Sequence, residues 1–490
     1  MNYQSTRNAN IHATAAEAVL QGLAPDGGLY TMPSLSGIRL DWQAVLQMDT
    51  LSMAREILSA LLPSFSKEEM DALVRAAYDG KFETPELTPT VPVGDDAVLE
   101  LFRGPTSAFK DVALSMLPRL MTASREKCGV DDEILILTAT SGDTGKAAME
   151  GFRDVPGTKI IVFYPYGGVS AVQQRQMETQ EGRNVCVCAV RGNFDDAQTG
   201  VKEIFSAVEQ QKLLEGQQVR LSSANSINIG RLAPQVVYYF RSYADLCRSG
   251  RITVGDKVDF AVPTGNFGDI LAGFFARELG LPVGRLICAS NANNVLTDFF
   301  NTAVYDKNRP FLTTTSPSMD ILVSSNLERL VYLALNRDAA AVRERMEQLR
   351  NQGRYALPEE AMARIRACFT GVCASDQEGM DAIARVYRDH GYLMDPHTAV
   401  AWRGMEKAGT GSAPCVVLST ASPCKFPACV LTALGQSVPQ DAQAQLDALT
   451  SLGAPLPRAL DGVLQRPVRF SDVIDPEDMM AYVQGKAASK

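Results

Sequence analysis

Histidine is scarce in this chain, with only 3 among 490 residues, and the 10 cysteines include no C-x-x-C pair. Zinc sites are built mainly from closely spaced cysteines and histidines, so we expect free thiols in a reducing compartment and no bound metal. The first ten residues lack the apolar core of a signal peptide, and no apolar run approaches the about 18 residues of a membrane span. We therefore expect a cytoplasmic protein with no membrane partner.

Basic residues are outnumbered: 47 lysines and arginines stand against 56 aspartates and glutamates, which gives a net charge of −9. Nucleic-acid binding needs a basic surface, so we expect no nucleic-acid partner. A local cluster of cations and backbone N–H groups can still bind a small anion within an acidic protein. The length suits roughly two to four domains and exceeds what a single core supports.

Short apolar runs, each followed by a small-residue turn and a helical pattern, recur along the later part of the chain. The clearest lie at residues 134–137, 159–164, 185–190, 259–263 and 416–418. This alternation predicts the strands of parallel α/β sheets. Helix-spaced apolar residues predict a helical N-terminal region over residues 1–90, and the charged stretch at about residues 300–395 predicts a helical insertion.

Five polar or glycine-containing stretches stand at the predicted strand ends and helix starts. They are residues 104–111 (GPTSAFKD), 138–146 (TATSGDTGK), 223–231 (SANSINIGR), 263–269 (PTGNFGD) and 419–426 (STASPCKF). Ligands of open parallel sheets gather at the carboxyl ends of the strands, where helix N-termini present N–H groups to anions. Each stretch taken alone suits a structural turn equally well, with Asp143 as an ordinary helix cap.

Lys110 follows an aromatic residue in a largely apolar setting and opens a predicted amphipathic helix. Such a setting lowers the pKa of a lysine, as Schiff-base chemistry requires. On its own, however, a lysine at the start of a helix is more often solvated than catalytic. Only together with the other four stretches does this one indicate a catalytic lysine.

In this order, the five stretches closely resemble the threonine synthase family, in the longer form found in many bacteria and in yeast. The resemblance extends from residues 5–7 (STR) and 21–29 (QGLAPDGGL) to residues 395–400 (DPHTAV). It implies the α/β fold of fold-type II pyridoxal-phosphate enzymes, which is like that of the tryptophan synthase β subunit. That fold has two parallel-sheet domains. In this chain we expect the helical N-terminal region and the helical insertion in addition to them. We expect a large cofactor-binding domain from residues 91–114 and 251–490, and a smaller substrate domain from residues 115–250.

The resemblance also implies roles for single residues and pyridoxal 5'-phosphate as the cofactor. Lys110 is the catalytic residue and holds the cofactor as a Schiff base. The cofactor-binding residues are Lys110, Phe109, Gly265, Asn266, Phe267, Gly268, Asp269 and Thr420. The substrate-binding residues are Ser141, Asp143, Thr144, Asn225, Ser226, Asn228 and Arg231. Two positions depart from the family pattern: Arg103 stands where many relatives have histidine, and Cys424 where alanine is common.

The implied reaction is that of a lyase in threonine biosynthesis. It converts O-phospho-L-homoserine and water into L-threonine and phosphate by γ-elimination and β-addition of water, in a monomer or homodimer. Related alternatives remain open: a dehydratase, a cysteine synthase, or a phospholyase that yields a 2-oxo acid. A non-catalytic binding protein that kept the fold is another. A nicotinamide oxidoreductase is disfavoured, because no dinucleotide fingerprint follows an early strand.

Overall fold

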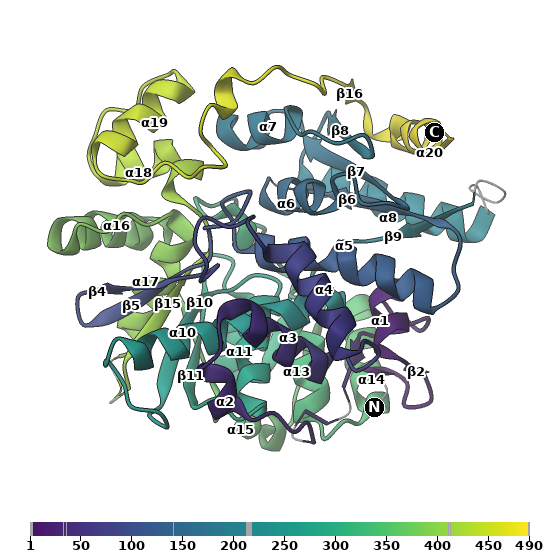
Figure 1. The fold of residues 1–490 in the computed structure, drawn as a ribbon, viewed down its shortest axis with the longest axis horizontal. Helices are drawn as coiled ribbons and strands as arrows, with labels where there is room; N and C mark the ends of the chain where they lie inside the picture. The colour runs from purple at the N-terminus through teal and green to yellow at the C-terminus, as the bar shows by residue number, and fades with distance from the viewer. Residues whose placement is uncertain are drawn as a thin grey trace.

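Two parallel sheets organise the computed structural model, which describes residues 3–488 except residues 33, 36, 141, 212–217, 410 and 412. The larger sheet has six strands and lies in the lower part of Figure 1. Its order is β14 (Phe369–Cys373), β11 (Val283–Ser290), β10 (Val258–Pro263), β15 (Cys415–Ser419), β5 (Asp96–Glu100) and β4 (Thr90–Val93). Only the edge strand β4 runs antiparallel to its neighbour.

The smaller sheet has five parallel strands and lies in the upper part of Figure 1. Its order is β16 (Val473–Ile474), β8 (Val185–Val190), β7 (Thr158–Pro165), β6 (Glu133–Ala139) and β9 (Val219–Ser222). Both faces of β6 are buried, since Ile134 and Ile136 join one apolar cluster while Leu135 and Leu137 join another. Burial on both faces explains why the strand is a continuous apolar run.

Helices cover both sheets. Those after the N-terminal region are α5 (Lys110–Lys127), α6 (Asp143–Phe152), α7 (Ala171–Glu178), α8 (Phe194–Gln211), α9 (Ile229–Leu232), α10 (Val236–Arg248), α11 (Gly268–Glu278), α12 (Val295–Thr302), α13 (Leu327–Ala334), α14 (Ala339–Gln352), α15 (Glu359–Arg366), α16 (Asp376–His390), α17 (Pro396–Ala408), α18 (Pro427–Ala433), α19 (Ala442–Ser451) and α20 (Met479–Ala488). Helix α17 packs on β10, β11 and β15, while α8 packs on β6 and β7. None of the described helices is both long and apolar enough to span a membrane.

The N-terminal region is mostly helical, as predicted, and also contains a small antiparallel sheet. Its helices are α1 (Ala15–Gln21), α2 (Trp42–Leu46), α3 (Thr50–Leu61) and α4 (Lys67–Tyr78), and its strands are β2 (His12–Ala13), β1 (Tyr3–Ser5) and β3 (Tyr30–Thr31). Capping boxes at Thr14 and Ser66 fix the starts of α1 and α4. Both α1 and α4 pack against α5, so this region supports the helix that begins with Lys110.

The five predicted strands and the predicted start of α5 are confirmed. The structure differs from the predicted organisation in two places, because the elements concerned are too short to show a periodic pattern. The segment predicted as a helical insertion contains the two-stranded sheet of β12 (Val304–Asp306) and β13 (Arg354–Ala356), and its strand β14 pairs with β11 of the larger sheet. The C-terminal β16, placed with the large domain, pairs with β8 of the smaller sheet. The domain boundaries themselves stay a prediction.

Candidate active site

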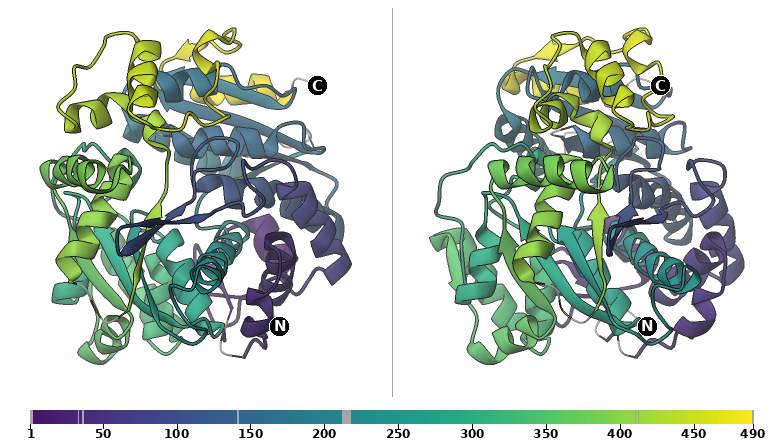
Figure 2. Two further views of the ribbon diagram at one scale, coloured as in Figure 1. Left: turned by 60° about the vertical axis from the view of Figure 1, so that its left-hand side comes forward. Right: turned by 90° about the vertical axis from the view of Figure 1, so that its left-hand side faces the viewer.

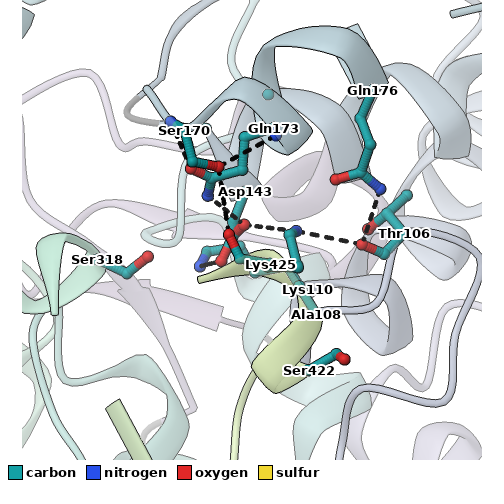
Figure 3. Close-up of polar contacts among 12 residues, drawn as sticks. Thr106, Ala108, Lys110, Asp143, Ser170, Gln173, Gln176, Ser318, Ser422 and Lys425 are labelled. Carbon is teal, nitrogen blue, oxygen red and sulfur yellow. Dashed lines mark hydrogen bonds and ion pairs between the residues drawn. The ribbon is translucent and has the colours of Figure 1, made fainter. Parts of the chain in front are cut away.

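The turn before α5 lies against the end of β15. The Phe109 N–H donates to the Thr420 carbonyl at 2.8 Å, and Ala108 forms a bridge with Ala421. These contacts bring Lys110, the first residue of α5, to the carboxyl end of the larger sheet. The predicted Lys110, Phe109 and Thr420 are therefore neighbours in space (Figure 3 shows Lys110 and Ala108).

Lys110 is buried, with 8% of the residue exposed. Its Nζ lies 4.6 Å from the centroid of the Phe109 ring and 3.9 Å from Asp143 Oδ2. Burial lowers the pKa of Lys110 to about 8. The negative charge of Asp143 raises this pKa, whereas the positive charges of Lys425 and Arg231 lower it further. A much larger share of this amine is therefore unprotonated near neutral pH than in an ordinary lysine.

Asp111 holds the turn that presents Lys110. Its Oδ2 accepts a hydrogen bond from the Thr106 N–H at 2.8 Å, and its Oδ1 accepts another from the Thr106 hydroxyl. A side chain at Gly104 would collide with this carboxylate, because a Cβ there would lie 2.5 Å from Asp111 Oδ2. Burial raises the pKa of Asp111 to about 6. The glycine of the GPTSAFKD stretch is thus required by the close approach of this side chain.

Asp143, the first residue of α6, lies at the centre of the polar contacts in Figure 3. Its Oδ1 is 2.5 Å from Lys425 Nζ and accepts a hydrogen bond from Gln173 Nε2 at 2.9 Å. Burial opposes ionisation of this carboxyl, but the charges of Lys425 and Lys110 outweigh it and hold the pKa below the usual range. Asp143 is therefore a buried carboxylate anion rather than an ordinary solvated helix cap.

The glycine turn at residues 265–268 leads from β10 into α11, and its carbonyl groups are held by a neighbouring segment. The Gly265 carbonyl accepts from Ser324 Oγ at 2.6 Å, and the Asn266 carbonyl accepts from the Asn326 N–H at 3.1 Å and from its Nδ2 at 3.0 Å. Among the described residues, the backbone N–H groups of residues 265–268 make no hydrogen bond. Unpaired N–H groups at a helix N-terminus form a receptor for a phosphate monoester.

Close packing explains why this turn begins with glycine. A Cβ at Gly265 would lie 3.0 Å from the Ser318 carbonyl oxygen and 3.2 Å from Met319 Cα. The first residues of the turn and helix therefore fit the phosphate of the cofactor that the sequence implies.

Asp269, one residue into α11, is buried and accepts from the Tyr238 hydroxyl at 2.5 Å. Burial raises the pKa of Asp269 to about 7.

Arg231 supplies a second place for an anion. The residue is 3% exposed, and its Nη1 donates to the Ala224 carbonyl at 2.7 Å, but no acceptor for its buried Nε is found among the described residues. Burial lowers the pKa of Arg231 to about 10. Its positive charge also lowers the pKa of Lys110, which is consistent with a position facing the same site. A buried guanidinium with spare donors suits an oxyanion.

The remaining predicted residues vary in their surroundings. Asn228 is buried and is used by the fold, because its Oδ1 accepts from the Gly230 N–H at 2.8 Å and its Nδ2 donates to the Val19 carbonyl at 2.9 Å. Asn225 is exposed, and Ser226 and Thr144 are half-buried. Ser141 lies outside the described residues.

Three features were not predicted from the sequence. Lys425 and Gln173 both contact Asp143; Lys425 stands within the STASPCKF stretch, but nothing local distinguishes it from a solvated lysine. Arg103, which departs from the family pattern, binds Glu100 at 2.6 Å and Glu83 at 3.2 Å. Its guanidinium is therefore neutralised by two carboxylates.

Comparison with known proteins agrees with this geometry. A family model described as a pyridoxal-phosphate dependent enzyme matches residues 97–421. Models described as the threonine synthase N terminus and the threonine synthase C-terminal part match residues 2–78 and 398–483. Together they cover residues 2–78 and 97–483, which contain nearly all of both sheets but not the edge strand β4.

Individual relatives match over most of the chain. Threonine synthase of Pseudomonas aeruginosa is 39% identical over 444 residues, which covers 89% of this chain and 91% of that protein. Threonine synthase-like 1 of Macaca fascicularis is 36% identical over 466 residues, but the match covers 92% of this chain and only 62% of that longer protein. The crystal structure of pyridoxal-phosphate-bound threonine synthase from Brucella melitensis has a TM-score of 0.88 at 38% identity and covers 100% of both chains.

Proposed function

Because the chain belongs to the threonine synthase family of pyridoxal-phosphate-dependent enzymes, we propose that it makes L-threonine and phosphate from O-phospho-L-homoserine and water. The observation that carries the proposal is the buried Lys110, whose lowered pKa suits a lysine that binds an aldehyde cofactor and responds to the charge of Asp269, the residue after the glycine turn. The proposed small-molecule substrate is an anion, and the buried Arg231 offers a spare donor for it.

We assign the cofactor to the groups that meet around Lys110. The N–H groups of residues 265–268 would bind its phosphate, and the Thr420 hydroxyl would meet its pyridine nitrogen. Phe109 and Asp269 complete the pocket. When bound, this cofactor supplies an electron sink for bond cleavage next to the substrate amine. A neutral hydroxyl partner for the ring suits elimination better than a carboxylate partner does.

We assign the substrate to the opposite wall of the site. Arg231, with Asn225 and Ser226 beside it, binds the substrate phosphate through charge-assisted hydrogen bonds. Ser141, Asp143 and Thr144 hold the amino-acid end. Asn228 acts by fixing the loop that carries Arg231, because both ends of its amide are already bound within the protein.

Lys110 moves the protons in this scheme. Its amine would be free once the substrate amine is bound to the cofactor, and it would remove a proton from Cα and then one from Cβ of the substrate. The pKa of about 8 leaves enough of the amine unprotonated to act as a base near neutral pH. Arg231 would hold the phosphate that leaves Cγ. The two protons taken by Lys110 would return to Cγ and Cα, and water would give its hydroxyl to Cβ and its proton to the released phosphate. We place the reaction in the cytoplasm, and the oligomeric state stays open between monomer and homodimer.

Borohydride reduction of the purified, cofactor-loaded protein tests the assignment. We expect the visible absorbance of the bound cofactor to disappear, and peptide mapping to find the modification on Lys110. The reduced protein should then release no phosphate from O-phospho-L-homoserine.

The product of the unreduced protein separates threonine synthesis from its rivals. Threonine supports the proposal, whereas 2-oxobutyrate would make the protein a phospholyase. No phosphate release at all, with modification of a lysine other than Lys110, would point to a binding protein that kept the fold.

A further inference from the structure

Lys425 is fully buried, with 0% of its side chain exposed. Its Nζ lies 2.5 Å from Asp143 Oδ1 and donates to the Thr106 carbonyl at 3.2 Å. A buried ammonium is stable only when it is paired, and Asp143 is the only carboxylate within 4.0 Å of this Nζ among the described residues. The fold therefore fixes this amine in one place.

The same residue joins the two sheets. Lys425 ends the short helix η3 (Pro423–Lys425) that follows β15 of the larger sheet, whereas Asp143 begins α6 after β6 of the smaller sheet. The Lys425 carbonyl also accepts from Ser170 Oγ at 3.2 Å, and Ser170 caps α7 beside the smaller sheet. Side chain and main chain of Lys425 are thus both bound by the elements across the site (Figure 3).

The negative charge of Asp143 needs a positive partner that stays in place throughout the reaction. Asp143 Oδ2 faces Lys110 at 3.9 Å, but Lys110 is the amine that exchanges between cofactor and substrate. The proposed substrate carries a carboxylate and a phosphate, and a bare Asp143 carboxylate would repel both. Lys425 has no part in the exchange, so its positive charge stays beside Asp143 throughout.

We propose that Lys425 is a positioning residue that holds Asp143 across the two sheets and cancels its charge, so that the anionic substrate meets a neutral pair. The inference rests on the proposed function, because only an anionic substrate makes an uncompensated carboxylate costly. It predicts that the requirement for Lys425 disappears when Asp143 is no longer charged.

A double-mutant cycle on the cofactor-loaded enzyme tests this coupling. Lys425→Met should raise the KM for O-phospho-L-homoserine at least about tenfold and change kcat less, because ground-state binding is what the bare carboxylate opposes. The double variant Asp143→Asn with Lys425→Met should return KM to within about threefold of the Asp143→Asn enzyme. Thermal unfolding of the cofactor-free proteins gives a readout independent of activity: Lys425→Met should unfold at a lower temperature, and the double variant should regain part of the loss.

Lys146→Met is the matched control. Lys146 is also buried and lies on α6, but its Nζ pairs with Glu150 at 3.5 Å and with Gln180. This variant should lose stability with no change in KM. If Lys425→Met behaves in the same way, Lys425 is only structural and the proposal is overturned.

Other outcomes are equally decisive. If Lys425→Met does not fold, the double variant should, since it removes both charges of the Asp143–Lys425 pair together; failure of both to fold would overturn the proposal. If the wild-type enzyme releases no phosphate, the proposed function fails. The unfolding cycle of the cofactor-free proteins then still decides whether Asp143 and Lys425 depend on each other, and additive effects there would count against the pairing.

Discussion

At the scale of single residues, the site places one amine among four charged groups. Two carboxylates, Asp143 and Asp269, raise the pKa of Lys110, while the cations Lys425 and Arg231 lower it together with the dominant effect of burial. The balance leaves the pKa of Lys110 near 8, so small changes in these charges alter the fraction of reactive amine at neutral pH.

The first prediction concerns the pH dependence of cofactor uptake by the cofactor-free protein. Only the unprotonated amine attacks an aldehyde, so the uptake rate should rise with pH and level off above about 8, the pKa of Lys110. Stopped-flow absorbance after mixing with pyridoxal 5'-phosphate measures this rate, and Nα-acetyl-lysine corrects for titration of the cofactor itself. Asp143→Asn should move the midpoint to lower pH, because it removes a carboxylate that raises the pKa. A midpoint near 10.5, the ordinary pKa of a lysine, would show that Lys110 behaves as a solvated side chain.

At the scale of elements, the glycine turn before α11 is shaped by a segment distant in the sequence. Ser324 and Asn326 bind the carbonyl groups of Gly265 and Asn266, while the N–H groups of residues 265–268 have no hydrogen-bond partner among the described residues. Phe267 adopts φ of 64°, in the left-handed region, immediately before the helix begins. The turn is therefore fixed on its outer side before any ligand binds.

Gly265→Ala tests this turn. The added Cβ would lie 3.0 Å from the Ser318 carbonyl oxygen, so that backbone must shift, at a cost of roughly 1–3 kcal/mol. We expect cofactor affinity, measured by equilibrium dialysis, to fall roughly tenfold or more.

Gly379→Ala is the control for this variant, because it lies within α16 and its nearest neighbour would be Ala399 Cβ at 3.9 Å. It should leave cofactor affinity unchanged. Equal affinity in the two variants would mean that the turn is loose enough to accept a side chain.

At the scale of the whole molecule, the chain returns at its C-terminus to the smaller sheet. Figure 2 shows this C-terminal segment lying beside the smaller sheet. Strand β16 pairs with β8, the Ala189 N–H donates to the Asp472 carbonyl at 2.9 Å, and α20 packs on α8. Met479 and Val483 of α20 are buried in the apolar cluster beneath that sheet. Both ends of the chain thus pack against elements that support the site.

Truncation after residue 470 tests the contribution of this segment. Loss of β16 and α20 uncovers the edge of β8 and the apolar cluster, at a cost of roughly 5 kcal/mol from the buried side chains alone. We expect a lower thermal unfolding midpoint and increased binding of a hydrophobic dye. Gly485→Ala is the control, since nothing lies within 4 Å of an added Cβ there and alanine favours a helix. An unchanged midpoint after truncation would show that the smaller sheet is stable without the C-terminal segment.

The amino-acid sequence by itself determined the parallel sheets, the helix that begins at Lys110 and the glycine turn after β10. These features are local: continuous apolar runs report strands buried on both faces, and each turn and the following helix start are contiguous in the chain. The family resemblance had the same basis, since its motifs are unbroken stretches.

Only the tertiary structure decided that Lys425 is a buried partner of Asp143, that Ser324 and Asn326 bind the carbonyls of the glycine turn, and that β16 completes the smaller sheet. Each of these pairs segments that are far apart in the chain and show no periodic pattern. A lysine that is solvated and one that is buried look the same in a sequence. What separates them is the removal of water and the approach of a carboxylate, and both follow from packing one sheet against the other.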